Sequence, residues 1–146
     1  TKKKPLELTH TSGDPYASCG SERIEKLVRL TNQTREDEKN LHPVHCAPEL
    51  AEVARAHAED MCAKDYISHT SKDGRTMVDR AEQAGIEFMA LGENVAMGQR
   101  SPQMVHSQWM GSRYHRKNIL NDKFSRLGVG YAHCDGKRYW VELFGN

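Results

Sequence analysis

The sequence lacks the short signatures that assign a chemistry directly. It contains no GxSxG nucleophile elbow, no GxxxxGK[ST] phosphate-binding loop and no HExxH metal-binding helix. Its cysteines form no CxxC pair, which argues against a zinc finger and against a thioredoxin-type redox centre. The enzyme classes that these motifs define are therefore not indicated.

Neither sign of charge dominates, and long hydrophobic runs are absent. The 21 Lys and Arg residues against 20 Asp and Glu give a net charge of +1, which provides no electrostatic footprint for nucleic acid. No apolar stretch approaches the roughly 20 residues of a membrane-spanning helix, and the chain shows no charged-then-apolar leader. We therefore expect no nucleic-acid partner and no membrane span. The chain is expected to be either cytosolic or a mature fragment whose leader is gone.

Four scattered cysteines favour a mature fragment of a secreted protein over a cytosolic chain. The 146 residues suit one domain, of a size that buries roughly 68–70% of its unfolded surface. An even number of separated cysteines, Cys19, Cys46, Cys62 and Cys134, suits two disulfides formed in an oxidising compartment. Free buried thiols are the alternative, and three disulfide connectivities remain open.

The hydrophobic pattern predicts helices in the first part of the chain and a β-hairpin at its end. Residues 1–20 lack periodicity and are expected to form an extended arm before a domain spanning 21–146. Predicted helices run from an N-cap at Ser21 to about Thr34 and over 49–64, 75–84, 102–110 and 115–120, with a short strand at 86–89 and an extended or coiled segment at 93–97. Strands at 127–133 and 139–144 flank an Asp-Gly turn. This order indicates an α+β fold of packed layers.

Four positions in these elements carry separate expectations. Gly128 and Gly130 weaken the packing of their strand and allow another backbone or a helix to approach it closely. His57 falls on the apolar face of its helix, where a buried histidine with one hydrogen-bond partner is favoured over a ligand. His106 points away from the inner face of its helix and is expected to be solvated.

Two histidines and one glutamate are candidates for a functional site. His69, Glu93 and His115 each lie beside a glycine or a turn and on no regular amphipathic pattern. Neutral imidazoles are good zinc ligands, and a carboxylate can orient or deprotonate a bound water. Two histidines alone predict an open, weak metal site rather than strong metal-driven catalysis. The alternative is that all three are ordinary loop residues.

Several segments together resemble a known family. Their order, YISHTS, LGENVA, QWMGS, HRKNIL, RLGVGY and YWVELFGN, resembles the CAP superfamily of cysteine-rich secretory proteins, antigen 5 and pathogenesis-related proteins, in its compact bacterial-type branch. The resemblance runs from about Glu22 to Phe144. It implies a three-layer α-β-α sandwich with a small, mainly antiparallel sheet. It also implies secretion to the extracellular space, or to the periplasm or cell surface of a bacterium.

The resemblance also implies a cleft with two histidines and up to two glutamates. His69 and His115 match the two cleft histidines, and Glu93 matches the glutamate of the GEN motif. The place of the second glutamate, three residues after Trp109, is taken by Ser112. Activity that requires two carboxylates is therefore not expected.

The sandwich implied by the resemblance suggests the disulfides Cys19–Cys62 and Cys46–Cys134. The functional hypothesis is a secreted binding module whose cleft holds zinc or another divalent cation, or a small ligand. Similar proteins bind sterols or other lipids, and some act as toxins, immune modulators or adhesins, so a lipid, sterol or host-protein partner is implied. The alternatives are a weak metal-dependent hydrolase with Glu93 as general base, and a structural surface domain.

Overall fold

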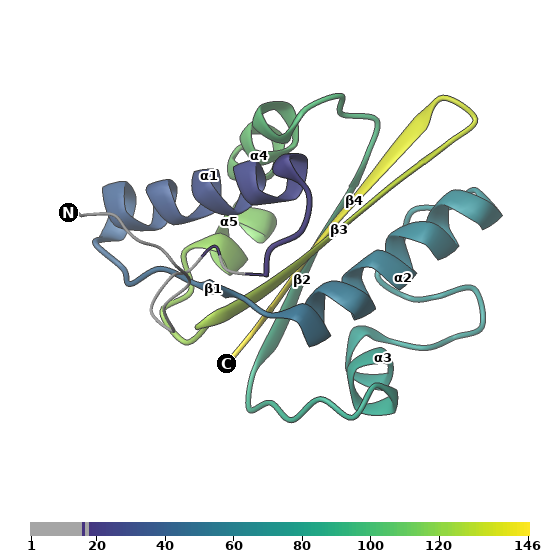
Figure 1. Cartoon of the computed structure of the whole chain (residues 1–146), viewed down its shortest axis with the longest axis horizontal. Coiled ribbons are helices and arrows are strands. Elements are labelled where there is room, and N and C mark those ends of the chain that lie inside the picture. Colours follow the sequence, from purple (N-terminus) through teal and green to yellow (C-terminus); the bar gives the residue numbers. More distant parts are fainter. Residues whose placement is uncertain (1–15, 17) are drawn as a thin grey trace.

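A computed structural model of the chain describes Tyr16 and residues 18–146; most of the predicted arm lies outside these residues. Helices and strands alternate irregularly along the chain (Figure 1). In order they are α1 (Glu22–Lys39), β1 (His45–Cys46), α2 (Pro48–Lys64), α3 (Met77–Gln83), β2 (Leu91–Met97), α4 (Pro102–Met110), α5 (Arg113–Ile119), β3 (Arg126–Cys134) and β4 (Lys137–Gly145). No helix of the described part is long and apolar enough to cross a membrane.

The strands form one sheet in the order β1-β3-β4-β2. Only β1 pairs in parallel, with β3, and the other neighbours are antiparallel. The predicted turn joins β3 to β4 at Asp135 and Gly136, which have φ angles of 50° and 76°. Positive φ at both central residues is what a two-residue hairpin turn of type I′ requires.

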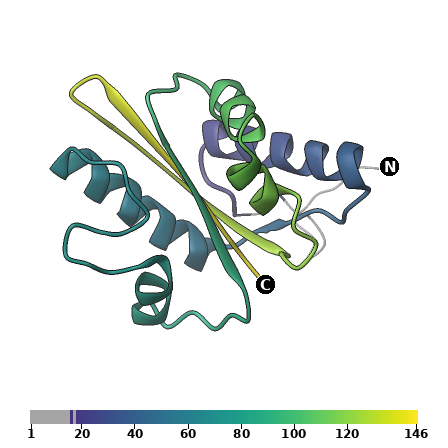
Figure 2. The same ribbon diagram turned by 180° about the vertical axis from the view of Figure 1, so that it is seen from behind.

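Helices cover both faces of the sheet, which confirms the predicted three-layer α-β-α sandwich (Figures 1 and 2). Alternation along each strand sends its side chains to two separate cores. Trp140 and Phe144 of β4 belong to the core under α1, α4 and α5, whereas Val141 and Leu143 belong to the core under α2 and α3. Fully buried apolar side chains of this size each stabilise the fold by about 1.5–3 kcal/mol.

The predicted close approach at Gly128 and Gly130 is confirmed, and the approaching element is α2. A Cβ atom at Gly128 would lie 2.2 Å from the backbone N of Ala51, and one at Gly130 would lie 2.3 Å from the backbone C of Ala54. Any side chain at these positions would therefore collide with helix backbone. The two glycines bring α2 onto β3 with both elements running in the same direction.

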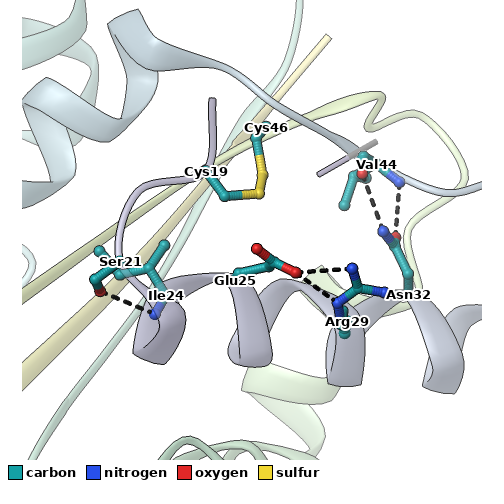
Figure 3. The surroundings of a disulfide bond; sticks show 8 residues. All are labelled: Cys19, Ser21, Ile24, Glu25, Arg29, Asn32, Val44 and Cys46. Atoms are coloured by element: carbon teal, nitrogen blue, oxygen red, sulfur yellow. Dashed lines mark hydrogen bonds and ion pairs between the residues drawn. A yellow bond between two sulfur atoms is a disulfide. The ribbon is translucent and has the colours of Figure 1, made fainter. Parts of the chain in front are cut away.

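The predicted disulfide pairing is wrong. Cys19 bonds to Cys46, which joins the start of α1 to β1 (Figure 3), and Cys62 bonds to Cys134. Since α2 and β3 run in the same direction, the last turn of α2 brings Cys62 to the end of β3. Cys46 instead pairs in register with Leu127, seven residues before Cys134 on β3, which is a separation of roughly 23 Å along a strand.

Helix α1 continues beyond Thr34, where the sequence predicted its end. Arg35 is completely buried and donates hydrogen bonds to the backbone carbonyls of His42, Ile119, Asn121 and Phe124. One helical arginine thus satisfies backbone acceptors from two distant loops. Those tertiary contacts extend the helix to Lys39. The composition of this stretch alone indicated a polar loop.

Two further local predictions are wrong. The strand expected at 86–89 lies instead at Leu91–Met97, and it includes the stretch 93–97, for which the sequence left extended and coiled conformations open. Its seven residues pair fully with β4, so strand pairing decided the conformation of this glycine-bounded segment. His106 is buried rather than solvated, because a ring nitrogen lies 2.8 Å from Thr34 Oγ1 of the neighbouring α1.

Candidate functional site

Glu93 lies in the centre of β2 with its side chain only 1% exposed. Its Oε1 is 3.0 Å from Nδ1 of His69, and its Oε2 accepts a hydrogen bond of 2.8 Å from Nη1 of Arg80. Burial by itself raises the pKa of Glu93, but the hydrogen bonds from His69 and Arg80 outweigh it and hold the pKa below its usual value. Glu93 is therefore an ionised carboxylate with both oxygens engaged.

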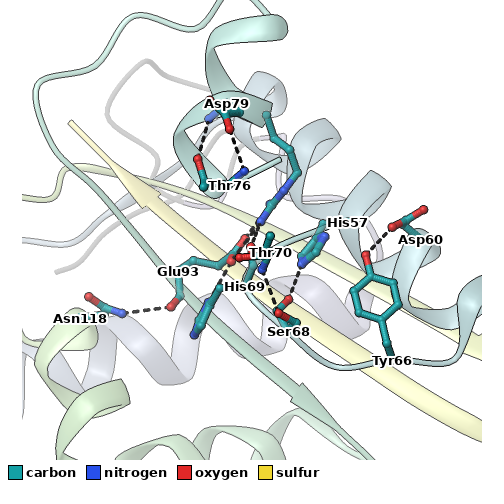
Figure 4. Close-up of polar contacts among 11 residues, drawn as sticks. His57, Asp60, Tyr66, Ser68, His69, Thr70, Thr76, Asp79, Glu93 and Asn118 are labelled. Carbon is teal, nitrogen blue, oxygen red and sulfur yellow. Dashed lines mark hydrogen bonds and ion pairs between the residues drawn. The ribbon is translucent and has the colours of Figure 1, made fainter. Parts of the chain in front are cut away.

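This ionised carboxylate fixes the tautomer of His69. Glu93 accepts hydrogen bonds and donates none, so Nδ1 of His69 carries the proton and donates it to Oε1. When the ring is neutral, this bond leaves the lone pair on Nε2, and the side chain is 41% exposed. Figure 4 shows His69 beside Glu93. Arg80 adds a hydrogen bond from Nη2 to the backbone carbonyl of His69, which holds the loop after α2 against the ion pair.

His115 reaches the same region from α5, with Tyr114 between the two imidazoles. The Tyr114 ring makes edge contacts with both, at centroid distances of 5.9 Å to His69 and 5.5 Å to His115. Burial lowers the pKa of His115, and the positive charge that His69 carries when it is protonated lowers it further. A neutral His115 is thus favoured, and its buried Nδ1 has no hydrogen-bond partner within Tyr16 and residues 18–146.

A hollow of about 320 Å³ opens beside these groups. His69, Glu93 and Tyr114 line it, together with Thr70, Thr76, Met77, Leu91, Gly92 and Asn118. The sequence-predicted residues His69 and Glu93 are therefore in direct contact and share one hollow. His115 stands beside its wall, behind Tyr114, and does not line it.

The GEN segment holds α5 against β2. Asn118 donates from Nδ2 to the backbone carbonyl of Glu93 at 3.2 Å and to Oδ1 of Asn94 at 2.9 Å. Asn94 in turn donates to the backbone carbonyl of His115 at 3.2 Å. A Cβ at Gly92 would lie 2.7 Å from Oδ1 of Asn118, so only glycine allows this approach. These bonds fix the element that carries His115.

Sequence reasoning missed Arg80, Tyr114, Asn94 and Asn118. Arg80 had a usable signal, because it falls on the inner stripe of α3 between Met77 and Ala81, where a charged residue needs a buried partner. The other three depend on the pairing of distant segments, for which a single sequence gives no spacing rule.

Few side chains near the hollow could act as metal ligands. Ser112, at the position of the second glutamate implied by the resemblance, is the N-cap residue of α5 and makes no side-chain capping bond. Within Tyr16 and residues 18–146, no group of three or more His, Cys, Asp or Glu residues is placed to hold a metal ion. The two imidazoles are therefore the available nitrogen donors.

Comparison with known proteins defines the class. Residues 28–144 match the CAP family, described as the cysteine-rich secretory protein family, and the chain belongs to that family. It is 38% identical over 138 residues to the uncharacterized protein YkwD of Bacillus subtilis (strain 168), covering 94% of this chain and 52% of YkwD. The chain thus spans about half the length of this relative.

Solved structures agree with the fold. An extracellular protein containing an SCP domain from Bacillus anthracis str. Ames superposes with a TM-score of 0.77 at 31% identity, over 84% of this chain and 39% of that one. An outer surface protein of Borrelia burgdorferi gives 0.80 at 24% identity, over 86% and 92%. The two disulfides of the present chain fit a secreted protein.

Proposed function

We propose that this CAP domain is an extracellular binding module whose hollow beside His69 and Glu93 takes a divalent transition metal such as zinc, or a small polar ligand. The observation that carries the proposal is the hydrogen bond from Nδ1 of His69 to Glu93. It leaves Nε2 as a lone-pair donor on a ring held in one orientation. A carboxylate behind a histidine is the usual outer partner of a metal-binding imidazole.

With Tyr114 turned out from between the two imidazoles, the available residues would suit a metal in an open, weakly held arrangement. His69 and His115 would hold the ion, and Glu93 would orient His69 rather than bind the ion itself. Two protein ligands are fewer than a catalytic zinc site usually has, so water or a ligand would complete the coordination. The metal would supply a Lewis acid at the hollow.

A hydrolase that uses Glu93 as general base is less well supported. Both carboxylate oxygens are engaged, by His69 and by Arg80, and the pKa of Glu93 is below its usual value. A general base works best with a pKa near the operating pH and within reach of the proton it removes. Glu93 is suited instead to positioning His69.

The size of the hollow favours a small ligand. Its 320 Å³ lies at the low end of the range for drug-sized ligands, about 300–1,000 Å³. A sterol, another lipid or a host protein, which the family resemblance implies as partners, would have to use additional surface beyond this hollow.

Zinc calorimetry tests the proposal. We expect the wild-type chain to bind zinc and His69→Ala to weaken that binding by at least tenfold. His115→Ala should weaken it as well, while His133→Ala, which removes an exposed histidine of β3, should not. Equal affinity in all four proteins would refute the site. Turnover that is lost in Glu93→Gln while zinc is retained would establish the hydrolase instead.

A further inference from the structure

A second hollow, of about 270 Å³, lies between α2 and α3, on the other side of Arg80 from the hollow beside His69. Val53, Ala56 and Ala84 give it apolar walls. Its polar lining includes His57, Ser71 and Arg80, which are 1%, 4% and 6% exposed. The hollow thus combines an apolar body with a buried polar end.

Three polar atoms of these residues are closed to solvent and have no hydrogen-bond partner among the described residues. They are Nδ1 of His57, Oγ of Ser71 and Nε of Arg80. A buried polar group without a partner costs free energy, and most such groups in native proteins are satisfied by protein or by a bound molecule. All three atoms belong to residues that line one hollow, which favours a molecule bound there as the missing partner.

The hydrogen bond made by Nε2 of His57 determines whether its other ring nitrogen, Nδ1, donates or accepts. Nε2 lies 2.8 Å from the backbone carbonyl of Ser68 (Figure 4), and a carbonyl only accepts, so Nε2 carries a proton. Burial lowers the pKa of His57, which favours the neutral ring. Nδ1 therefore has a lone pair and accepts a hydrogen bond.

The other two atoms have equally defined roles. Nε of Arg80 only donates, and the charge of this guanidinium is already balanced by Glu93. The Ser71 hydroxyl both donates and accepts. The three atoms are therefore one acceptor, one donor and one group of both kinds. The other charged residues that line the hollow, Glu52, Asp60 and Arg75, each form an ion pair with a neighbour.

We propose that the hollow between α2 and α3 binds a small neutral amphiphile with a hydroxyl or carboxamide head group and a short apolar body. Such a head group donates to His57 Nδ1 and accepts from Arg80 Nε. A carboxylate has no proton for His57 and meets the charge of Glu93 behind Arg80, so it is rejected. Because the three atoms are closed to solvent, entry requires movement of the segment 65–76 that carries Ser71, which has no regular secondary structure.

Benzamide and benzoate provide a matched pair of probes, since they differ only in the head group. In a ¹H–¹⁵N NMR titration, we expect benzamide to shift the amides of Ser71 and its loop saturably, with a dissociation constant on the order of millimolar. Benzoate should give no saturable shift there. Ser71→Ala should weaken benzamide about five- to tenfold through one lost hydrogen bond.

Two leucine variants on α2 supply the control. Ala56→Leu fills the hollow from an exposed helical position and should abolish the benzamide shifts. Ala63→Leu makes the same change at an exposed position of the same helix outside the hollow and should leave them intact. Equal shifts with benzoate, shifts that survive Ala56→Leu, or a crystal structure with only ordered water in the hollow under saturating benzamide would each overturn the proposal. Zinc binding at His69 is measured separately, so neither result decides the other.

Discussion

Arg80 and Glu93 form an ion pair that is almost wholly enclosed, with 2.8 Å between Nη1 and Oε2 and side-chain exposures of 5% and 1%. The pair joins α3 to β2 and lies between the two hollows. Removing one partner leaves the other charge buried, which costs about 3–5 kcal/mol. We expect Arg80→Gln to lower the free energy of unfolding by that amount in urea denaturation.

Arg75→Gln is the matched control. Arg75 pairs with Asp73, but both side chains are largely exposed, and exposed pairs contribute roughly 0–1 kcal/mol. If the two glutamine variants lost similar stability, the enclosed pair would have no special role in the fold.

The contact between Gly130 and α2 gives a second prediction. The Cβ added by Gly130→Ala would lie 2.3 Å from a helix backbone carbon, so side-chain rotation offers no relief and α2 must shift. We expect a loss of at least about 3 kcal/mol, at the upper end of overpacking effects. Gly111→Ala has no contact closer than 3.5 Å and should change the thermal midpoint little. A neutral Gly130→Ala would contradict the packing.

Glu142 predicts an unusual pH dependence. It is completely buried in β4, accepts a hydrogen bond from Thr31 Oγ1 at 2.7 Å, and bonds to Asn94 Nδ2 at 3.3 Å. Burial raises the pKa of Glu142 to about 7, although both hydrogen bonds act to lower it. The folded state therefore holds a proton that the unfolded chain releases near pH 4.5.

For such a group, stability falls as pH rises from about 4.5 to 7 and then levels off, by a total on the order of 3 kcal/mol. Glu142→Gln keeps the shape and both partners but does not ionise, so its stability relative to wild type should increase across this window. The lowered pKa values of His57, His106 and His115 act in the opposite direction and cancel in the comparison. Parallel pH profiles of the two proteins in urea denaturation would rule out a neutral Glu142.

The disulfides can be checked chemically. Non-reducing peptide mapping should recover Cys19–Cys46 and Cys62–Cys134. Cys62 and Cys134 are 72 residues apart in the sequence. In the chain-entropy model, a disulfide that closes a loop of this length raises the free energy of unfolding by about 4 kcal/mol. The double variant Cys62→Ala/Cys134→Ala should lose stability on that scale, and peptides joining Cys19 to Cys62 would contradict the structure.

The sequence predicted the layered fold because its signals were local. The cap at Ser21, the Asp135-Gly136 turn and the glycines at 128 and 130 each impose a conformation or a close approach that few other residues allow. The disulfide pairing failed for a different reason. It depended on the relative direction of α2 and β3, which no local pattern encodes.

The site was predicted in part. His69 and Glu93 carried their own signal, since each is a titratable residue beside a turn or glycine. Tyr114 did not stand out in the same way, because an exposed tyrosine is ordinary until the fold brings it to the imidazoles. Arg80 did carry a signal, its place on the inner stripe of α3, but the sequence alone did not name Glu93 as its partner. The central claim is that His115 completes a metal site with His69.

Anomalous diffraction from a zinc-soaked crystal tests this most directly. The account predicts a zinc peak bonded to Nε2 of His69 and to the ring of His115, with Tyr114 turned aside and Glu93 still bonded to Nδ1 of His69. A peak on His69 alone, or none near either imidazole, would contradict the two-histidine site.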